Sequence, residues 1–268
     1  MSTSTSGSAP CNELPPHKLG PGRQLRLLSY NIQTGINYHH YGHYLTRSWR
    51  HVMPCGTRRK NLDRIAAGLD AFDLVALQET DAGSLRTGFT NQTEYLARQS
   101  RFPYWLDQTN RRLGRFARHS NGLLCRFEPH GVLRHRLPGL PGRGALVAEF
   151  ATTFGSLGVF VLHLALGRAT RLRQMRYLAE CVNAFDQVIF MGDLNCDPWS
   201  PEMQLLIDET RLQAPSRDHG TFPSWRPRRG IDHILVTPEI GIRRSYVPHW
   251  RYSDHLPIAM DVTLPEST

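Results

Sequence analysis

Eight polar side chains that could bind a metal ion or a phosphate group stand at the ends of short apolar segments. Four apolar segments end in such residues: LRLLSYN, DLVALQE, VFVLH and VIFMGDLN, which contribute Asn31, Glu79, His163, and Asp193 with Asn195. Two further segments begin with them, at Asp232 in IDHILV and at Asp254-His255 before LPIAMDV. Carboxylates, imidazoles and carboxamides bind hard cations and transfer protons. One catalytic edge of a sheet pair would bring all eight together, because rigid strands hold the residues at their ends in place.

Each of these residues also has an ordinary structural interpretation when taken alone. Glu79 could be a surface carboxylate, His163 a hydrogen-bonded core histidine, and Asn31 a turn former. Asp193 differs, because a carboxylate directly after VIFMG is costly to bury without a partner. Six strand-end coincidences in one chain favour a shared functional site over six separate structural explanations.

The elements that must position these residues are mostly strands. Short apolar runs bounded by turn residues predict strands over 25–32, 73–78, 122–127, 131–137, 145–152, 157–164, 187–191, 231–236, 242–247 and 257–264. Helical periodicity predicts helices over 57–72, 90–101 and 168–185, and a fourth that begins near Pro201. Four strands would arrive at the site and two would leave it, so they cannot all be parallel. We therefore expect an α/β protein with mixed sheets and helices outside.

Local spacing refines the expected site. Asp193 and Asn195 are two positions apart, so an extended backbone would point both side chains to the same side. Asp254 and His255 are adjacent and would diverge in a regular strand. They can act together only if the segment is irregular, which Pro257 favours.

Composition limits the class of protein. The chain has 268 residues, of which 40% are hydrophobic and 21% are charged, so full disorder, a fibre and a coiled coil are excluded. No apolar run approaches the ~18–20 residues of a membrane span. The net charge is +9, and Lys18 and Lys60 are the only lysines. Arginine suits phosphate oxygens, but codon bias explains the excess equally well, so the charge permits a phosphate-bearing partner without naming one.

The cysteines and the amino-terminal residues indicate a cytoplasmic protein. Five cysteines without a C-x-x-C pair argue against a disulfide framework or a zinc knuckle. Residues 1–22 are rich in Ser, Thr, Pro and Gly and lack the apolar segment of a signal peptide. We expect a disordered lead-in over 1–22 and one catalytic domain over 23–265.

The motifs together resemble the endonuclease/exonuclease/phosphatase superfamily of metal-dependent, DNase I-like phosphoesterases. The matching motifs are S-Y-N at 29–31, L-Q-E at 77–79, S-N-G-L-L at 120–124, L-H-L at 162–164, G-D-L-N at 192–195, T-F-P with R-G-I-D-H-I-L-V at 221–236, and S-D-H-L-P at 253–257. The resemblance covers about residues 24–264. It implies a four-layer α/β sandwich, in which two mixed β-sheets pack face to face with helices outside, and this agrees with the strand argument.

The resemblance also implies a role for each matching residue. Glu79 would be the main ligand of Mg²⁺ or Mn²⁺, with Asn31 beside it and Asp254 as a further ligand or a support. Asp193 would orient or deprotonate the attacking water, and Asn195 would hold a phosphate oxygen. His163 would bind a phosphate oxygen or the leaving group. His255 would face the scissile phosphate, oriented by Asp232. Asn121 is also expected to contact substrate phosphate. Arg226, Arg228 and Arg229 are expected to do so because they lie just before Ile231 and Asp232, close to the inferred site.

One position departs from the abasic-site endonucleases, which typically carry an acidic residue where this chain has Gln33. His163 places the chain closer to the DNase I and sphingomyelinase side. Substrate class stays open among nucleic acid, a phospholipid-like phosphodiester and a phosphomonoester. The alternative is a catalytically inactive module on the same fold that binds phosphate-bearing ligands.

Two other segments have open interpretations. The loop over 36–55 contains His39, His40, His43 and His51, whose spacing fits no standard zinc pattern, and it could line the substrate cleft or touch a membrane. The basic segment 111–118 could be a solvated loop, or could contact a nucleic-acid backbone or anionic lipid headgroups. We expect a monomer with a phosphate-ester substrate, cytoplasmic or peripheral at a membrane surface.

Overall fold

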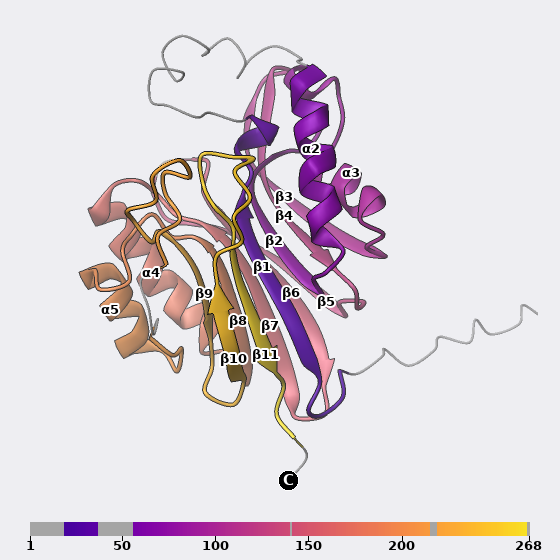
Figure 1. The fold of residues 1–268 in the computed structure, drawn as a ribbon. Helices are drawn as coiled ribbons and strands as arrows, with labels where there is room; N and C mark the ends of the chain where they lie inside the picture. Colours follow the sequence, from indigo (N-terminus) through magenta and orange to yellow (C-terminus); the bar gives the residue numbers. More distant parts are fainter. Residues whose placement is uncertain (1–18, 37–55, 140, 215–218, 267–268) are drawn as a thin grey trace, which may run out of the picture.

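The computed structural model of the chain describes residues 19–36, 56–139, 141–214 and 219–266, and two sheets dominate them (Figure 1). The first sheet has six strands, in the order β10 (Gly241–Tyr246), β11 (Ile258–Thr263), β1 (Gln24–Asn31), β2 (Leu74–Asp81), β4 (Ala117–Cys125) and β3 (Tyr104–Leu113). The second has five, in the order β5 (Gly131–Arg136), β6 (Gly144–Thr152), β7 (Gly155–His163), β8 (Gln187–Asp193) and β9 (Asp232–Val236). Both sheets are mixed: β1 with β2 and β7 with β8 are parallel, and the other pairs are antiparallel.

Helices cover the outer face of each sheet. The first sheet carries α2 (Gly56–Leu69) and α3 (Gln92–Gln99), and the second carries α4 (Arg168–Val182) and α5 (Pro201–Glu209). Two of these helices begin at side-chain caps. Asn91 accepts hydrogen bonds from the first-turn amides of α3, and Ser200 does so at α5, where Pro201 fits the first turn. The four helices predicted from the sequence are all present.

Three apolar layers hold the four structural layers together. One lies between the sheets, and each of the other two lies between a sheet and its helices. A sheet covered on both faces needs strands that are apolar throughout, and every residue of β8 is buried. The four-layer α/β sandwich expected from the sequence is therefore confirmed.

One strand was missed by sequence analysis. The missed strand is β3, and the basic segment 111–118, for which the sequence indicates a loop, forms the tip of the hairpin between β3 and β4, with Arg112 opposite Arg118. Strand β3 lies at the sheet edge and is mostly half-buried or exposed. An edge strand needs no continuous apolar run, so its sequence YWLDQTNRRL gives a weak periodic signal.

The first and last described residues of the chain pack against the sheets. Leu19, assigned to the lead-in by the sequence, is buried and bridges Thr152, and the amide of Gly22 donates to the carbonyl of Pro265 at 3.0 Å. Residues 1–18 and most of the histidine-rich loop, 37–55, lie outside the described residues. Over the described ranges, no helix combines the length and apolarity needed to cross a bilayer.

Candidate active site

Most of the expected site residues lie at one end of the sheet pair. This is the end at which β1 leads into the short helix η1 (Gln33–Gly35) in Figure 1. Strand pairing sets His163 opposite Asp193, and Asp193 opposite Asp232. Between the sheets, Nδ2 of Asn31 donates to Oδ2 of Asp193 at 3.0 Å. The mixed strand directions required by the sequence argument therefore deliver these side chains to one place.

A buried hydrogen-bonded trio forms the centre of the site. Nδ1 of His255 donates to Oδ2 of Asp232 at 2.9 Å, and the same oxygen accepts a hydrogen bond from the hydroxyl of Thr221 at 2.6 Å. Nε2 of His255 lies 3.9 Å from Oδ2 of Asp193. The ring of Phe222 packs at 4.8 Å from the imidazole, centroid to centroid. Asp232 therefore fixes which ring nitrogen of His255 faces the open side of the site.

The surroundings raise the pKa values of both His255 and Asp193. Burial alone would lower the pKa of His255, but the charges of Asp232 and Asp193 and the hydrogen bond to Asp232 raise it well above its usual value. Burial, followed by the charge of Asp232, raises the pKa of Asp193 to about 7, although His255 and the Asn31 amide oppose that shift. The result is a protonated imidazole beside a carboxyl group that titrates near neutrality.

Glu79 and His163 form the side of the site nearest to solvent. Nε2 of His163 lies 3.4 Å from Oδ2 of Asp193 and 4.0 Å from Oε1 of Glu79. Burial, reinforced by the charges of Arg143, His255 and His119, holds the pKa of His163 well below its usual value. The Glu79 side chain is 37% exposed, yet burial of its surroundings and the charge of Asp254 raise its pKa. A neutral imidazole thus lies beside an open carboxylate.

Asp254 is anchored by Gln33, the residue that departs from the abasic-site pattern. Nε2 of Gln33 donates to one carboxylate oxygen of Asp254 at 3.0 Å, and the Ser253 hydroxyl donates to the other at 3.1 Å. The segment over 253–257 is irregular, as the sequence predicted, so Asp254 and His255 can serve the same site. Sequence analysis did not find this role of Gln33.

Asn195 corrects the argument from strand spacing. Its backbone is left-handed, with a φ of 53°, because β8 has already ended at Asp193. The backbone amide of Asn195 donates to Oδ1 of Asp193 at 3.0 Å, and its side-chain amide donates to the Leu164 carbonyl at 2.9 Å. Asn195 is therefore next to Asp193 because the chain turns, not because an extended strand alternates.

A pocket of about 230 Å³ opens beside Glu79 and His163 and contains Asn121 and Arg143. Nδ2 of Asn121 donates to the Gly144 carbonyl at 3.1 Å, which fixes that side chain in the pocket wall. Arg143, which sequence analysis missed, stands directly before β6, and its pKa is lowered by burial against the opposing charges of Glu79 and Asp193. Applying the strand-end criterion to the start of β6 would have found it.

The structure does not bring the three predicted arginines of the 221–230 loop into this cluster. Arg226, Arg228 and Arg229 are exposed. Arg229 lies 3.5 Å from Asp197, and within the described residues Arg226 and Arg228 make no side-chain hydrogen bond or ion pair. Their contact with substrate phosphate stays a prediction.

Negative charge exceeds positive charge in the site, as a cation-binding site requires. The charged groups are four carboxylates and two cations: Glu79, Asp193, Asp232 and Asp254 against His255 and Arg143. Donor atoms of Asp193, Asp232 and His255 lie within 4.8 Å of one another. A protonated imidazole has no lone pair for a metal, however, so the open Glu79 oxygen with the Asn31 amide beside it is the better donor set for a hard cation.

The layered fold is that of the DNase I-like phosphoesterases. The chain belongs to the endonuclease/exonuclease/phosphatase family, whose sequence model matches residues 28–255. No curated protein sequence matches the chain.

Solved structures show the same fold at low sequence identity. An endonuclease/exonuclease/phosphatase from Beutenbergia cavernae is 22% identical with a TM-score of 0.69, over 91% of this chain and 72% of that one. A mannosyl-6-phosphatase from Bacteroides thetaiotaomicron is 16% identical with a TM-score of 0.64, over 89% and 99%. A humanized TDP2 from D. rerio is 17% identical with a TM-score of 0.62, over 89% and 98%.

Proposed function

We propose that the chain is a divalent-metal-dependent hydrolase that cleaves a phosphate ester with an activated water molecule. The observation that carries the proposal is the buried carboxyl of Asp193, whose pKa of about 7 suits proton transfer at neutral pH. Asn31 donates to this carboxyl, and His163 and His255 lie within 3.9 Å of it. Asp193 would orient the attacking water and accept its proton.

The two histidines differ in protonation and therefore in role. His255, held protonated by Asp232, would place a cation beside the phosphate as negative charge grows in the transition state. His163 is neutral, so it would donate a hydrogen bond to a phosphate oxygen or to the leaving group. Arg143 and the side-chain amide of Asn195 would bind the remaining phosphate oxygens.

Glu79 and Asn31 would hold Mg²⁺ or Mn²⁺, with Asp254 supporting the site from behind. Their oxygen donors and the excess of carboxylates fit a hard divalent cation. When bound, such an ion neutralises charge on the phosphate and strengthens it as an electrophile. The substrate stays open among nucleic acid, a phospholipid-like phosphodiester and a phosphomonoester.

The alternative, an inactive module that binds phosphate-bearing ligands, predicts binding without turnover. Hydrolysis of bis(p-nitrophenyl) phosphate should be observed with Mg²⁺ or Mn²⁺ and abolished by EDTA, and restoring the metal should restore it. Full activity of metal-stripped protein in chelator would exclude metal dependence. Absence of turnover with every divalent ion, across DNA, RNA, sphingomyelin and inositol phosphates, would favour the binding module.

A further inference from the structure

Exposed large apolar side chains gather at the active-site end of the molecule. Among the described residues, seven large apolar side chains are exposed, and two of them, Leu133 and Ile242, lie away from this end. The other five stand in loops beyond the strand ends that carry the site: Phe89, Leu113, Phe116, Leu166 and Trp199, which are 66%, 43%, 57%, 76% and 68% exposed. We call these five residues the apolar rim.

The strand order explains why the rim surrounds the site. Phe89 follows β2, Leu166 follows β7 and Trp199 follows β8, the strands that present Glu79, His163 and Asp193. Leu113 and Phe116 flank the turn between β3 and β4, and the next residues of β4 line the pocket beside Glu79. Both sheets contribute, so the rim lies on two sides of the site opening.

Hydrogen bonds connect the two loops of the first sheet that carry rim residues. The amide of Leu85 donates to the Arg115 carbonyl at 2.9 Å, and the Ser84 hydroxyl donates to the Phe116 carbonyl at 2.9 Å. These bonds join the loop that carries Phe89 to the hairpin tip that carries Phe116.

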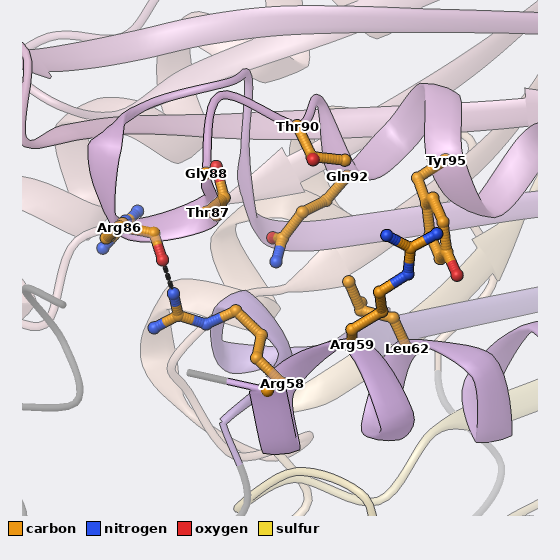
Figure 2. Close-up of a pocket in the computed structure, with 10 residues that line it drawn as sticks. Arg58, Arg59, Leu62, Arg86, Thr87, Gly88, Thr90, Gln92 and Tyr95 are labelled. Carbon is orange, nitrogen blue, oxygen red and sulfur yellow. Dashed lines mark hydrogen bonds between the residues drawn. The ribbon is translucent and has the colours of Figure 1, made fainter. Parts of the chain in front are cut away.

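Two further contacts hold the loop that carries Phe89, and both involve the short helix η3 (Leu85–Thr87). Figure 2 shows Arg58 of α2 donating to the Arg86 carbonyl across a pocket of about 360 Å³. The Arg86 side chain turns inward and binds Asp81, with Nε 2.6 Å from Oδ2. Because these contacts fix the loop, the exposure of Phe89 is a feature of the folded structure.

Positive charge accompanies the apolar rim. Arg111, Arg112 and Arg115 are exposed at the same hairpin, and Arg118 is half-buried next to them. None of these four arginines forms an ion pair with a described residue. Residues 82–93 and 108–127 contain no aspartate or glutamate, so no acidic side chain within these two segments offsets the charge.

We propose that the apolar rim and its arginines dock the protein on an anionic membrane surface, with the active site facing the lipid headgroups. Apolar side chains that enter the interface together with basic residues that meet anionic headgroups are the two components of peripheral membrane binding. A single-stranded nucleic acid fits less well, because it needs aromatic side chains on which its bases stack, whereas Leu113 and Leu166 cannot stack on bases. The proposal rests on the surface alone and does not require the hydrolytic activity.

Co-sedimentation with phosphatidylcholine vesicles, with and without phosphatidylserine, tests the surface in buffer containing EDTA. The wild-type protein should bind the anionic vesicles and lose binding as salt is raised. Phe89→Ser combined with Phe116→Ser, and separately Arg112→Gln combined with Arg115→Gln, should each weaken the partition coefficient about tenfold or more. Leu133→Ser and Ile242→Ser are matched controls at exposed apolar positions away from the site, and they should bind as the wild type does.

Three outcomes would overturn the proposal. The first is no binding to anionic vesicles, or equal loss of binding in the controls. The second is binding of a single-stranded oligonucleotide, but not of vesicles, that the rim variants lose. The third is a dimer in solution that the rim variants dissociate, since a second copy would then cover the rim. Thermal unfolding of each variant separates loss of vesicle binding from loss of folding. The single variants Phe89→Ser and Phe116→Ser are a second set in case the double variant does not fold. Hydrolysis of a soluble diester is measured separately, so failure of the activity leaves the vesicle result intact.

Discussion

Asp81 and Asp193 are two buried carboxylates at the active-site end of the sandwich, and their surroundings make them chemically opposite. Asp81 accepts hydrogen bonds from the Ser84 amide and hydroxyl, the Arg86 guanidinium, the Thr87 hydroxyl and the Arg118 amide. Burial alone would raise its pKa, but Arg86 and these hydrogen bonds lower it. Burial and neighbouring carboxylates instead raise the pKa of Asp193 to about 7.

Burial raises the pKa of both carboxyl groups, and the charge of their partners then separates them. The side chains of both residues are almost fully buried, at 0% and 2% exposed. Asp81 has one cation of its own and donors on both oxygens, so it stabilises the folded loop. Asp193 shares its surroundings with Asp232 and Glu79, so its ionised form is disfavoured and the proton becomes available for chemistry.

The largest effect should come from breaking the Asp81–Arg86 pair. Arg86→Ala would leave a buried carboxylate without its cation, and we expect a loss of about 3–5 kcal/mol in the free energy of unfolding. Chemical denaturation measures it, with Arg98→Ala as the control, because Arg98 pairs with Glu94 at the surface and should cost under about 1 kcal/mol. A loss below about 1 kcal/mol for Arg86→Ala would contradict the structural role given to Asp81.

Changes in the cluster around Asp193 should lower activity and leave stability largely unchanged. His255→Ala should lower kcat by about 10²–10³-fold, because a cation beside the developing charge is removed. Asp232→Asn should resemble it, since the imidazole loses the carboxylate that holds it protonated and oriented. Steady-state kinetics over a range of pH measure both variants, with His130→Ala as the control at a half-exposed histidine elsewhere.

The double variant decides whether His255 and Asp232 act as one unit. A unit predicts that the double variant loses little more activity than either single variant. If its loss equals the product of the two single losses, the residues act independently, and His163 or His233 must be considered as the histidine that faces the phosphate.

Glu79→Gln should have a smaller effect, confined to the metal. Replacing a charged ligand with an amide should raise the Mg²⁺ concentration needed for half-maximal rate by about tenfold or more. Its side chain is 37% exposed, so the free energy of unfolding should change little. A metal titration of activity, or of metal-induced thermal stabilisation, measures the shift. An unchanged titration would place the metal away from Glu79.

Strand ends were predictable from the sequence because apolar runs and the polar residues that close them are local signals. Asn31, His163 and Asp193 needed only that pattern, and the mixed strand directions followed from it. The role of Gln33 could be found only in the three-dimensional structure. Arg143 directly precedes a strand, but only the structure links it to Glu79 and Asp193. Gln33 reaches Asp254 from a position 221 residues away in the chain, and Arg143 meets Glu79 and Asp193 from another strand.

The same limit explains why the two carboxylate clusters could not be told apart in advance. Asp81 ends β2 two residues after Glu79, so strand position alone does not tell a structural carboxylate from a functional one. Charge on the neighbours decides their chemistry, and those neighbours come from the loop over 84–87, from β4 and from the second sheet.

His119 lies between the two clusters and gives the finest test of the comparison. Burial, followed by the charge of Arg86, lowers its pKa to about 4, against about 6.5 for an exposed histidine. Between these values the unfolded chain binds a proton that the folded protein does not, so this residue lowers stability as the pH falls from about 6.5 to about 4. Carboxylates such as Asp81, whose pKa is lowered, add their own loss only at still lower pH.

His119→Gln removes the titrating imidazole, so the free energy of unfolding should fall less as the pH is lowered. Because the side chain is partly exposed, we discount the full effect of the pKa shift and expect the loss of stability between pH 7 and pH 4.5 to shrink by about 1–2 kcal/mol. Denaturant unfolding at both pH values measures the difference, and the exposed His130→Gln serves as the control. The positive charge of Arg86 is one cause of the low pKa, so Arg86→Gln should raise the pKa of His119, measured by NMR, toward its ordinary value. If stability falls with pH in His119→Gln as it does in the wild type, His119 is solvated in the folded state, and the charge of Arg86 acts on Asp81 alone.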